Sequence, residues 1–247
     1  MNIMIDWQQR FEEQLKWTKD FRNYLFSKID LKNVRTVLDI GCGTGNLLIE
    51  LGKKYNFELY GIDINENRLK IADKWLKRQK IRANLYHMDL LDNNLKSERF
   101  DLILTHLFFL WVKDHEKAFY EIHRLLKESG TLLILAEPDY GGLIEYPDTG
   151  LKKALINSLK KEGADPFIGR KLQCFFKSKF KIKEAFTLSI PWLSYNNREG
   201  LKKEIKFFEE LLKDEPQFNL NELIKSINTE NYFLFNPVFS YFLSKIK

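Results

Sequence analysis

The sequence predicts an α/β fold, a three-layer sandwich built around a mostly parallel sheet. Short apolar runs alternate with longer segments of helical periodicity over the first 137 residues, and acidic residues stand at the ends of successive apolar runs. Strands that alternate with helices form βαβ units with right-handed crossovers. Because ligands of such sheets bind at the carboxyl ends of the strands, we expect the functional site at that edge.

The elements of this core follow one another at short intervals. The apolar runs predict strands at residues 36–40, 58–62, 83–87, 101–105 and 131–136. The periodic segments between them predict helices at 46–55, 66–77 and 115–127, each with Lys or Arg near its end. Five strands and their crossover helices therefore make up the predicted core.

Helices are predicted on both sides of this core. Apolar and aromatic residues recur at helical spacing between residues 5 and 29, which indicates one or two amphipathic helices. After Gly141 the pattern changes, with a turn around Pro166 at 164–169. The later elements are predicted helices at 151–161, 171–176, 201–212 and 220–227, and strands at 181–190 and 238–246.

The composition is that of a globular protein. Among 247 residues, 44% are hydrophobic and 30% are charged, which excludes a disordered or collagen-like chain. The first residues lack the basic start and apolar stretch of a signal peptide, and the longest apolar run, 102–112, is shorter than the ~20 residues of a membrane helix. The sequence predicts one cytoplasmic domain without a membrane partner.

Charge and cysteine content argue against nucleic-acid and metal sites. The net charge is +6, and the basic excess lies after residue 140, where lysines alternate with apolar residues at helical spacing. This pattern favours a solvated helix face over a phosphate-binding track, so nucleic acid is a possible but not a favoured partner. Cys42 and Cys174 are too few for a disulfide framework or a zinc site, and no metal is predicted.

A Gly-rich turn after the first predicted strand is the most informative feature. Residues 37–46 read Val-Leu-Asp-Ile-Gly-Cys-Gly-Thr-Gly-Asn, a strand that runs into a turn and then a helix. Glycines adopt positive φ and let backbone N–H groups approach a ligand closely. The turn therefore predicts a site for a nucleotide-like cofactor, with Cys42 as a small residue that fits there.

The residues around the turn indicate which cofactor it holds. A dinucleotide fingerprint has Gly or Ala three residues after Gly43, where this chain has Asn46. Asp39 and the three glycines at 41, 43 and 45 resemble instead the signature of class I S-adenosylmethionine-dependent methyltransferases, of the type 11/25 kind. The resemblance implies S-adenosyl-L-methionine as the cofactor. It also implies a Rossmann-like sandwich whose seven-stranded sheet is mostly parallel, with an antiparallel last strand, N-terminal helices and a helical insertion before that strand.

Two further acids extend the resemblance. Asp63 ends the second strand, where a carboxylate accepts hydrogen bonds from both ribose hydroxyls in NAD and S-adenosylmethionine sites alike. Asp89 ends the third strand, where the family has an Asp at the adenine amino group. Each acid alone is also explained by a turn or a helix N-cap. Over residues 36–137, the resemblance implies cofactor-binding residues at Asp39, Gly41, Cys42, Gly43, Gly45, Asp63, Ile64, Asp89, Leu90 and Thr105.

Side chains that follow the fourth and fifth strands face the cofactor in this fold. They give four candidates for chemistry on the acceptor: His106, Glu137, Asp139 and Tyr140. His106 is the first choice for a general base or a substrate contact, and a neutral His bonded to a backbone carbonyl is the alternative. Phe108, Phe109 and Trp111 line an apolar acceptor pocket unless they are ordinary core residues.

Methyl transfer requires that water be kept from the reacting atoms, so we expect a lid over the open edge of the sheet. The N-terminal helices and residues 139–170 are its candidates. Trp17 and Tyr24 share one helical face, which either covers the site or packs on the core. Arg170 pairs with an acidic substrate group or with a surface carboxylate. The candidate substrate contacts are Trp17, Tyr24, Asp139, Tyr140 and Arg170.

The sequence predicts an enzyme that transfers a methyl group from S-adenosylmethionine to a small-molecule acceptor. Residues 105–108 read Thr-His-Leu-Phe, without the Asn/Asp-Pro-Pro-aromatic motif of adenine or glutamine methyltransferases. A tRNA, rRNA or protein acceptor is the alternative, and a non-catalytic S-adenosylmethionine-binding protein is a third interpretation. The chain is interpreted as a single domain with a helical cap (1–30), a cofactor-binding core (34–137) and substrate-side and C-terminal elements (138–247).

Overall fold

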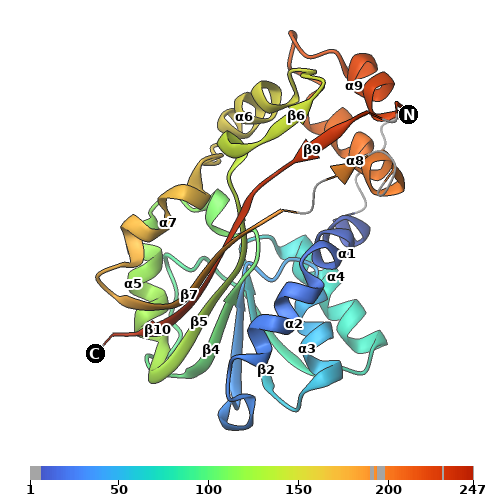
Figure 1. The fold of residues 1–247 in the computed structure, drawn as a ribbon. Helices are drawn as coiled ribbons and strands as arrows, with labels where there is room; N and C mark the ends of the chain where they lie inside the picture. The colour runs from blue at the N-terminus through green and yellow to red at the C-terminus, as the bar shows by residue number, and fades with distance from the viewer. Residues whose placement is uncertain (1–6, 190–191, 194–197, 230, 247) are drawn as a thin grey trace.

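A seven-stranded sheet forms the centre of the protein in a computed structural model, which describes residues 7–189, 192–193, 198–229 and 231–246 (Figure 1). Its strand order is β3-β2-β1-β4-β5-β10-β7, and only the pairings of β10 are antiparallel. The predicted mostly parallel sheet with an antiparallel last strand is confirmed. The strands are β1 (Thr36–Ile40), β2 (Glu58–Asp63), β3 (Ala83–His87), β4 (Phe100–Thr105), β5 (Leu126–Pro138), β7 (Phe180–Leu188) and β10 (Val238–Lys245).

Helices cover both faces of this sheet (Figure 1). Alternate residues of each central strand point to opposite faces, so that Leu102 and Leu104 of β4 belong to one hydrophobic cluster and Ile103 belongs to the other. The face of Leu102 packs against α2 (Lys19–Ser27), α3 (Asn46–Lys54) and α4 (Glu66–Arg78), and the face of Ile103 packs against α5 (His115–Leu125) and α7 (Ile168–Phe176). The three predicted layers are therefore present.

The order of the strands reverses between β1 and β4, because β2 and β3 lie on one side of β1 whereas β4 and β5 lie on the other. Loops that leave β1 and β4 at their carboxyl ends diverge there and leave room for a ligand. The N-terminal helix α1 (Trp7–Trp17) precedes α2, and η1 (Leu31–Asn33) leads into β1. The fold thus positions the Gly-rich turn at the reversal of strand order.

A second, smaller sheet was not predicted. It has the order β6-β9-β8 and packs with α6, α8 and α9 around a separate hydrophobic cluster that includes Leu155, Phe208 and Leu223. Strands of two or three residues are too short to show an alternating pattern, so no sequence signal predicts them. The elements are β6 (Ile144–Tyr146), α6 (Leu151–Lys161), β8 (Trp192–Leu193), α8 (Arg198–Leu211), α9 (Leu220–Ile227) and β9 (Phe233–Phe235).

Several predicted boundaries are corrected. The strand predicted at 131–136 runs from Leu126 to Pro138, and the helix predicted from residue 201 begins at Arg198. The helix predicted to reach residue 127 ends at Leu125, because Leu126 already pairs with Phe100 of β4. The helix predicted from residue 171 begins at Ile168, directly after the turn of Pro166. The first residues of the predicted cap and residue 190 lie outside the described residues. Among the described helices, none combines the length and the apolar character of a membrane span.

Candidate functional site

The Gly-rich turn forms a backbone cradle between β1 and α3. Gly41, Gly43 and Gly45 have φ values of 71°, 52° and 79°, a region that L side chains adopt only with strain. The N–H groups of Gly41 and Cys42 both donate to the carbonyl of Ile62, at 2.8 and 3.0 Å. These bonds fasten the turn to the end of β2 and fix the surface that it presents to a ligand.

A cavity of about 1220 Å³ opens beside this cradle at the carboxyl ends of β1, β2 and β4. The structure brings most of the predicted cofactor residues to its wall: Asp39, Gly41, Cys42, Gly43, Asp63, Ile64, Asp89 and Leu90. The remaining two do not line it. Gly45 faces α4, where an added Cβ would lie 3.1 Å from the Cβ of Ala72, and Thr105 is fully buried with no hydrogen bond for its hydroxyl among the described residues.

Two buried carboxylates lie in the cavity wall beside the cradle. Asp39 and Asp63 are only 2% and 6% exposed. Burial and the neighbouring Asp63 raise the pKa of Asp39 well above its ordinary value. The carboxylate of Asp39 also has no hydrogen-bond partner within the described part of the chain, whereas buried carboxylates are normally paired. The site therefore favours a ligand that carries positive charge or hydrogen-bond donors.

Asp63 also organises the cradle itself. Its Oδ2 accepts the N–H of Gly43 at 2.8 Å, and its Oδ1 accepts the N–H of Asn65 at 2.8 Å. Asn65 in turn caps α4, because its side chain accepts the N–H of Arg68. Each carboxylate oxygen keeps a further lone pair, so Asp63 can hold the turn and accept hydrogen bonds from a ligand at once.

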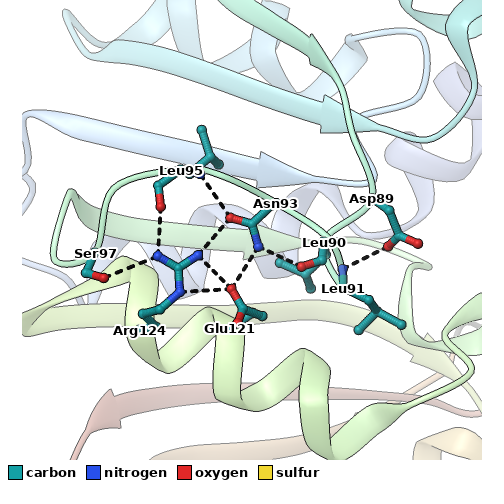
Figure 2. A network of polar contacts seen from close by, with 8 residues as sticks. All are labelled: Asp89, Leu90, Leu91, Asn93, Leu95, Ser97, Glu121 and Arg124. Atoms are coloured by element: carbon teal, nitrogen blue, oxygen red, sulfur yellow. Dashed lines mark hydrogen bonds and ion pairs between the residues drawn. The ribbon is translucent and has the colours of Figure 1, made fainter.

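Asp89 lines the cavity, and the segment after β3 to which it belongs is held by a polar network (Figure 2). Arg124 of α5 donates to the carbonyl of Leu95 at 2.7 Å and to the side chain of Asn93 at 2.9 Å. Asn93 donates to the carbonyl of Leu90 at 2.7 Å. Asp89 accepts the N–H of Leu91 at 2.9 Å, which is the contact expected of a turn residue. Asp89 is nevertheless exposed and lines the cavity.

His106 lies at the cavity wall directly after β4. Its Nε2 is 3.2 Å from the hydroxyl Oγ1 of Thr18, which lies between α1 and α2. The partner is therefore a side-chain hydroxyl and not the backbone carbonyl of the alternative prediction. Burial, followed by the charge of Arg22, lowers the pKa of His106 to about 3. Such a weakly basic imidazole is a poor general base at neutral pH, and the placement favours a substrate contact.

Glu137 is fully buried, and its carboxylate holds the turn that follows β4. It accepts backbone N–H groups of Phe108 at 2.8 Å, Phe109 at 3.0 Å and Leu110 at 3.3 Å, which start the short helix η2 (Phe109–Trp111). The preceding Leu107 has a φ of 55°, a strained value for a residue with a side chain. Glu137 is outside the cavity lining, so its contribution is to shape the wall that carries Phe108.

Replacing Glu137 with glutamine is expected to reduce the pH dependence of stability. Burial raises the pKa of Glu137 from 4.5 to about 7, although the three N–H groups oppose this. Between these pH values the folded protein holds a proton that the unfolded chain releases, so the free energy of unfolding falls as pH rises. In Glu137→Gln this fall should shrink by about 3 kcal/mol between pH 4.5 and 7.5, measured by urea denaturation. Parallel pH profiles for the two proteins would contradict the assignment.

Asp139 and Arg170 form an ion pair. Arg170 donates to both oxygens of Asp139, at 2.5 and 2.9 Å, and Asp139 is 2% exposed. Neither residue lines the cavity, so the structure does not bring them to a substrate as predicted. The sequence did not reveal this pair because its partners are 31 residues apart. Their neighbour Tyr140, which begins η3 (Tyr140–Gly142), does line the cavity.

The two aromatic residues predicted to cover the site lie elsewhere. The hydroxyl of Tyr24 donates to Glu184 on β7 at 3.1 Å, and its ring packs against Phe186. Trp17 lies under the guanidinium of Arg10, whose central carbon is 5.4 Å from the centre of the ring. Neither residue lines the cavity. The predicted shared helical face is wrong, because α1 ends at Trp17 and Tyr24 lies on α2, which begins at Lys19.

Other residues of α1 cover the cavity instead. Phe11 approaches the cradle so closely that a Cβ on Gly43 would lie 3.1 Å from its ring, and Gln8 donates to the side chain of Asn46 at 2.7 Å. Phe108 and Trp111 line the cavity as predicted for an acceptor pocket, whereas Phe109 is fully buried in the core. The lining residues that sequence reasoning missed include Arg10, Phe11, Gln14 and Leu15 of α1, and Phe207, Glu210 and Leu211 of α8.

Known proteins are similar to this chain in sequence. Residues 37–130 match the methyltransferase domain family. An uncharacterised protein of Methanocaldococcus jannaschii is 30% identical over 210 residues, which cover 81% of this chain and 83% of that protein. A demethylmenaquinone methyltransferase of Lactobacillus johnsonii is 31% identical over 123 residues, which cover 48% of this chain and 49% of that protein.

The fold is shared with solved methyltransferase structures. The crystal structure of geranyl diphosphate C-methyltransferase from Streptomyces coelicolor superposes with a TM-score of 0.55 at 11% identity, covering 86% of this chain and 74% of that chain. The chain spans 37% to 56% of the length of three curated methyltransferases that it matches. The domain match, the relative that is similar over most of the chain, and the glycines and acids of the signature all indicate the same family. The chain belongs to the class I S-adenosylmethionine-dependent methyltransferases.

Proposed function

We propose that this protein transfers the methyl group of S-adenosylmethionine to a small molecule bound in the same cavity. The observation that carries the proposal is the pair of buried carboxylates, Asp39 and Asp63, beside a glycine cradle. S-adenosylmethionine carries an ammonium and a sulfonium group, which suit a wall that lacks a paired cation at Asp39. The pyrophosphate of NAD would instead bring negative charge to the same wall.

The described residues fit this cofactor. The glycine cradle and Asp39 would hold its methionine end, Asp63 would accept the ribose hydroxyls, and Asp89 with Leu90 would hold the adenine. Asp63 has free lone pairs for this role, because its hydrogen bonds with Gly43 and Asn65 use one lone pair on each oxygen. When bound, the cofactor supplies a methyl group that is already activated by the positive sulfur.

The rest of the cavity would hold the acceptor. A volume of about 1220 Å³ exceeds the roughly 300–1000 Å³ of most small-ligand pockets, so a second small molecule fits beside the cofactor. Phe108, Tyr140 and Phe207 add aromatic surface to this region, and α1 covers it. A cavity with aromatic side chains in its wall suits a small apolar or aromatic acceptor better than an RNA strand, which binds along a basic groove.

The chain's own residues would act mainly by positioning and by excluding water. Methyl transfer requires the nucleophile to lie in line with the methyl group at about 3 Å, and a bound, desolvated acceptor meets this requirement at a much lower entropic cost. Phe11 closes the cavity above the cradle, and Glu137 fixes the turn that carries Phe108. A base is needed only where the acceptor atom starts protonated.

Measuring turnover with separated acceptor pools tests the proposal. The protein and S-adenosylmethionine are incubated with a small-metabolite fraction, with RNA or with a protein fraction, and S-adenosylhomocysteine is quantified. We expect product with the metabolite fraction and none from Asp63→Ala under the same conditions. Product formed only with RNA or protein would move the acceptor to another class, and binding without turnover in any pool would indicate a non-catalytic protein.

A further inference from the structure

A chain of buried polar contacts runs from α3 through the N-terminal helices to His106. Arg22 of α2 is 1% exposed, and its guanidinium forms an ion pair with Glu50 of α3. The same guanidinium donates to the carbonyl of Leu15 and to the hydroxyl of Thr18, both at 2.6 Å. Thr18 Oγ1 then contacts His106 Nε2 at 3.2 Å. A charged group buried in the helical layer is thus linked to a residue of the cavity wall.

The direction of the last hydrogen bond follows from what each group can do. An arginine can only donate, so its bond occupies a lone pair of the Thr18 oxygen. The hydroxyl keeps one proton, and His106 Nε2 is its one acceptor in the described part of the chain. Thr18 therefore donates to Nε2, which leaves the ring proton of the neutral imidazole on Nδ1. The opposite arrangement would leave the buried hydroxyl proton without an acceptor, at a cost that native structures avoid.

We propose that Thr18 is a positioning residue that fixes His106 in its Nδ1–H tautomer, so that His106 offers a hydrogen-bond donor to the acceptor molecule. This inference deepens the proposed function and rests on it for the identity of the ligand. Nδ1 has no hydrogen-bond partner among the described residues, while His106 lines the cavity. An acceptor molecule should then carry a hydrogen-bond-accepting oxygen or nitrogen close to the atom that is methylated.

The same network explains why His106 remains neutral. Nε2 is already occupied by a donor, and the nearby guanidinium of Arg22 opposes a second positive charge. His106 would therefore neither take a proton from the acceptor nor give one up during the reaction. The ordered hydroxyl would keep the imidazole from exchanging tautomers, which preserves the donor in every catalytic cycle.

The tautomer of His106 can be read directly. Long-range ¹H–¹⁵N spectra of histidine-labelled protein separate the two neutral tautomers, and His106→Gln assigns the signal among the four histidines of the sequence. We expect the Nδ1–H form in the unaltered protein and in Thr18→Ser, which keeps the hydroxyl. Thr18→Val should shift the population towards the Nε2–H form. Thr149→Val is the matched control, because it removes a buried hydroxyl that donates to Glu145 at 2.7 Å, away from the cavity.

Turnover provides the second readout. Thr18→Val should lower kcat/KM about tenfold, the effect of losing one well-placed hydrogen bond, and should leave S-adenosylhomocysteine affinity within about twofold. Thr18→Ser should restore turnover. An Nε2–H signal in the unaltered protein would overturn the proposal even if Thr18→Val fails to fold, as would an unchanged tautomer in a folded Thr18→Val. Absence of turnover with every acceptor contradicts the proposed function alone, since the tautomer is measured without an acceptor.

Discussion

Replacing Asp63 with alanine is expected to weaken S-adenosylhomocysteine binding by roughly 30-fold to 1000-fold, or about 2–4 kcal/mol. Two effects combine. The ribose would lose the charged acceptor for its hydroxyls, and the N–H groups of Gly43 and Asn65 would lose theirs. The cradle would then be free to shift away from the position that contacts the cofactor. Isothermal titration calorimetry on the folded variant measures the change.

Asp101→Ala is the matched control for this experiment. Asp101 also accepts two backbone N–H groups, from Arg35 at 3.0 Å and Thr36 at 2.9 Å, and it lies outside the cavity lining. Both variants should therefore lose stability, but only Asp63→Ala should lose affinity. An unchanged affinity in folded Asp63→Ala would show that the end of β2 does not hold the ribose.

Replacing Gly41 with alanine is expected to reduce cofactor affinity at least tenfold. Its φ of 71° strains any residue with a Cβ by roughly 1 kcal/mol, and the new Cβ would lie 2.8 Å from Cδ2 of Phe108. Because real Cβ atoms do not come so close to a ring, either the cradle or Phe108 must move. Both line the cavity, so either movement alters the site. Calorimetry with S-adenosylhomocysteine again gives the affinity.

Gly150→Ala separates backbone strain from the effect on the site. Gly150 has a φ of 78°, and nothing lies within 4 Å of the position that its Cβ would take. It precedes α6 and is outside the cavity lining. The two alanine variants should therefore lose similar stability in thermal unfolding, while Gly150→Ala keeps its affinity. Equal affinity in both variants would show that the Gly41 cradle does not contact the cofactor.

Local sequence patterns were sufficient to predict the core of the fold. The strands at 36–40 and 83–87 have the predicted bounds. The glycines of the cradle and the acids Asp39 and Asp63 could also be found from sequence. They belong to two short motifs, each at the end of a predicted strand.

The parts that could not be predicted depend on contacts between distant segments. Phe11 packs beside Gly43 of the cradle, and Thr18 contacts His106, which is 88 residues away in the sequence. No local pattern indicates either contact. The sequence left open whether Arg170 pairs with a substrate group or with a carboxylate of the protein, and in the structure its partner is Asp139, 31 residues away. Trp17 and Tyr24 were predicted to share one helical face, but the break between α1 and α2 at Thr18 places them on separate helices.

Thermal unfolding in the presence of candidate cofactors tests the central claim most directly. A ligand that binds only the folded state stabilises it in proportion to the logarithm of its concentration over its dissociation constant. S-adenosylmethionine and S-adenosylhomocysteine should therefore raise the Tm of the unaltered protein, NADH should leave it unchanged, and Asp63→Ala should lose most of the shift. A Tm raised by NADH and unaffected by S-adenosylhomocysteine would contradict the assignment of this cavity to S-adenosylmethionine.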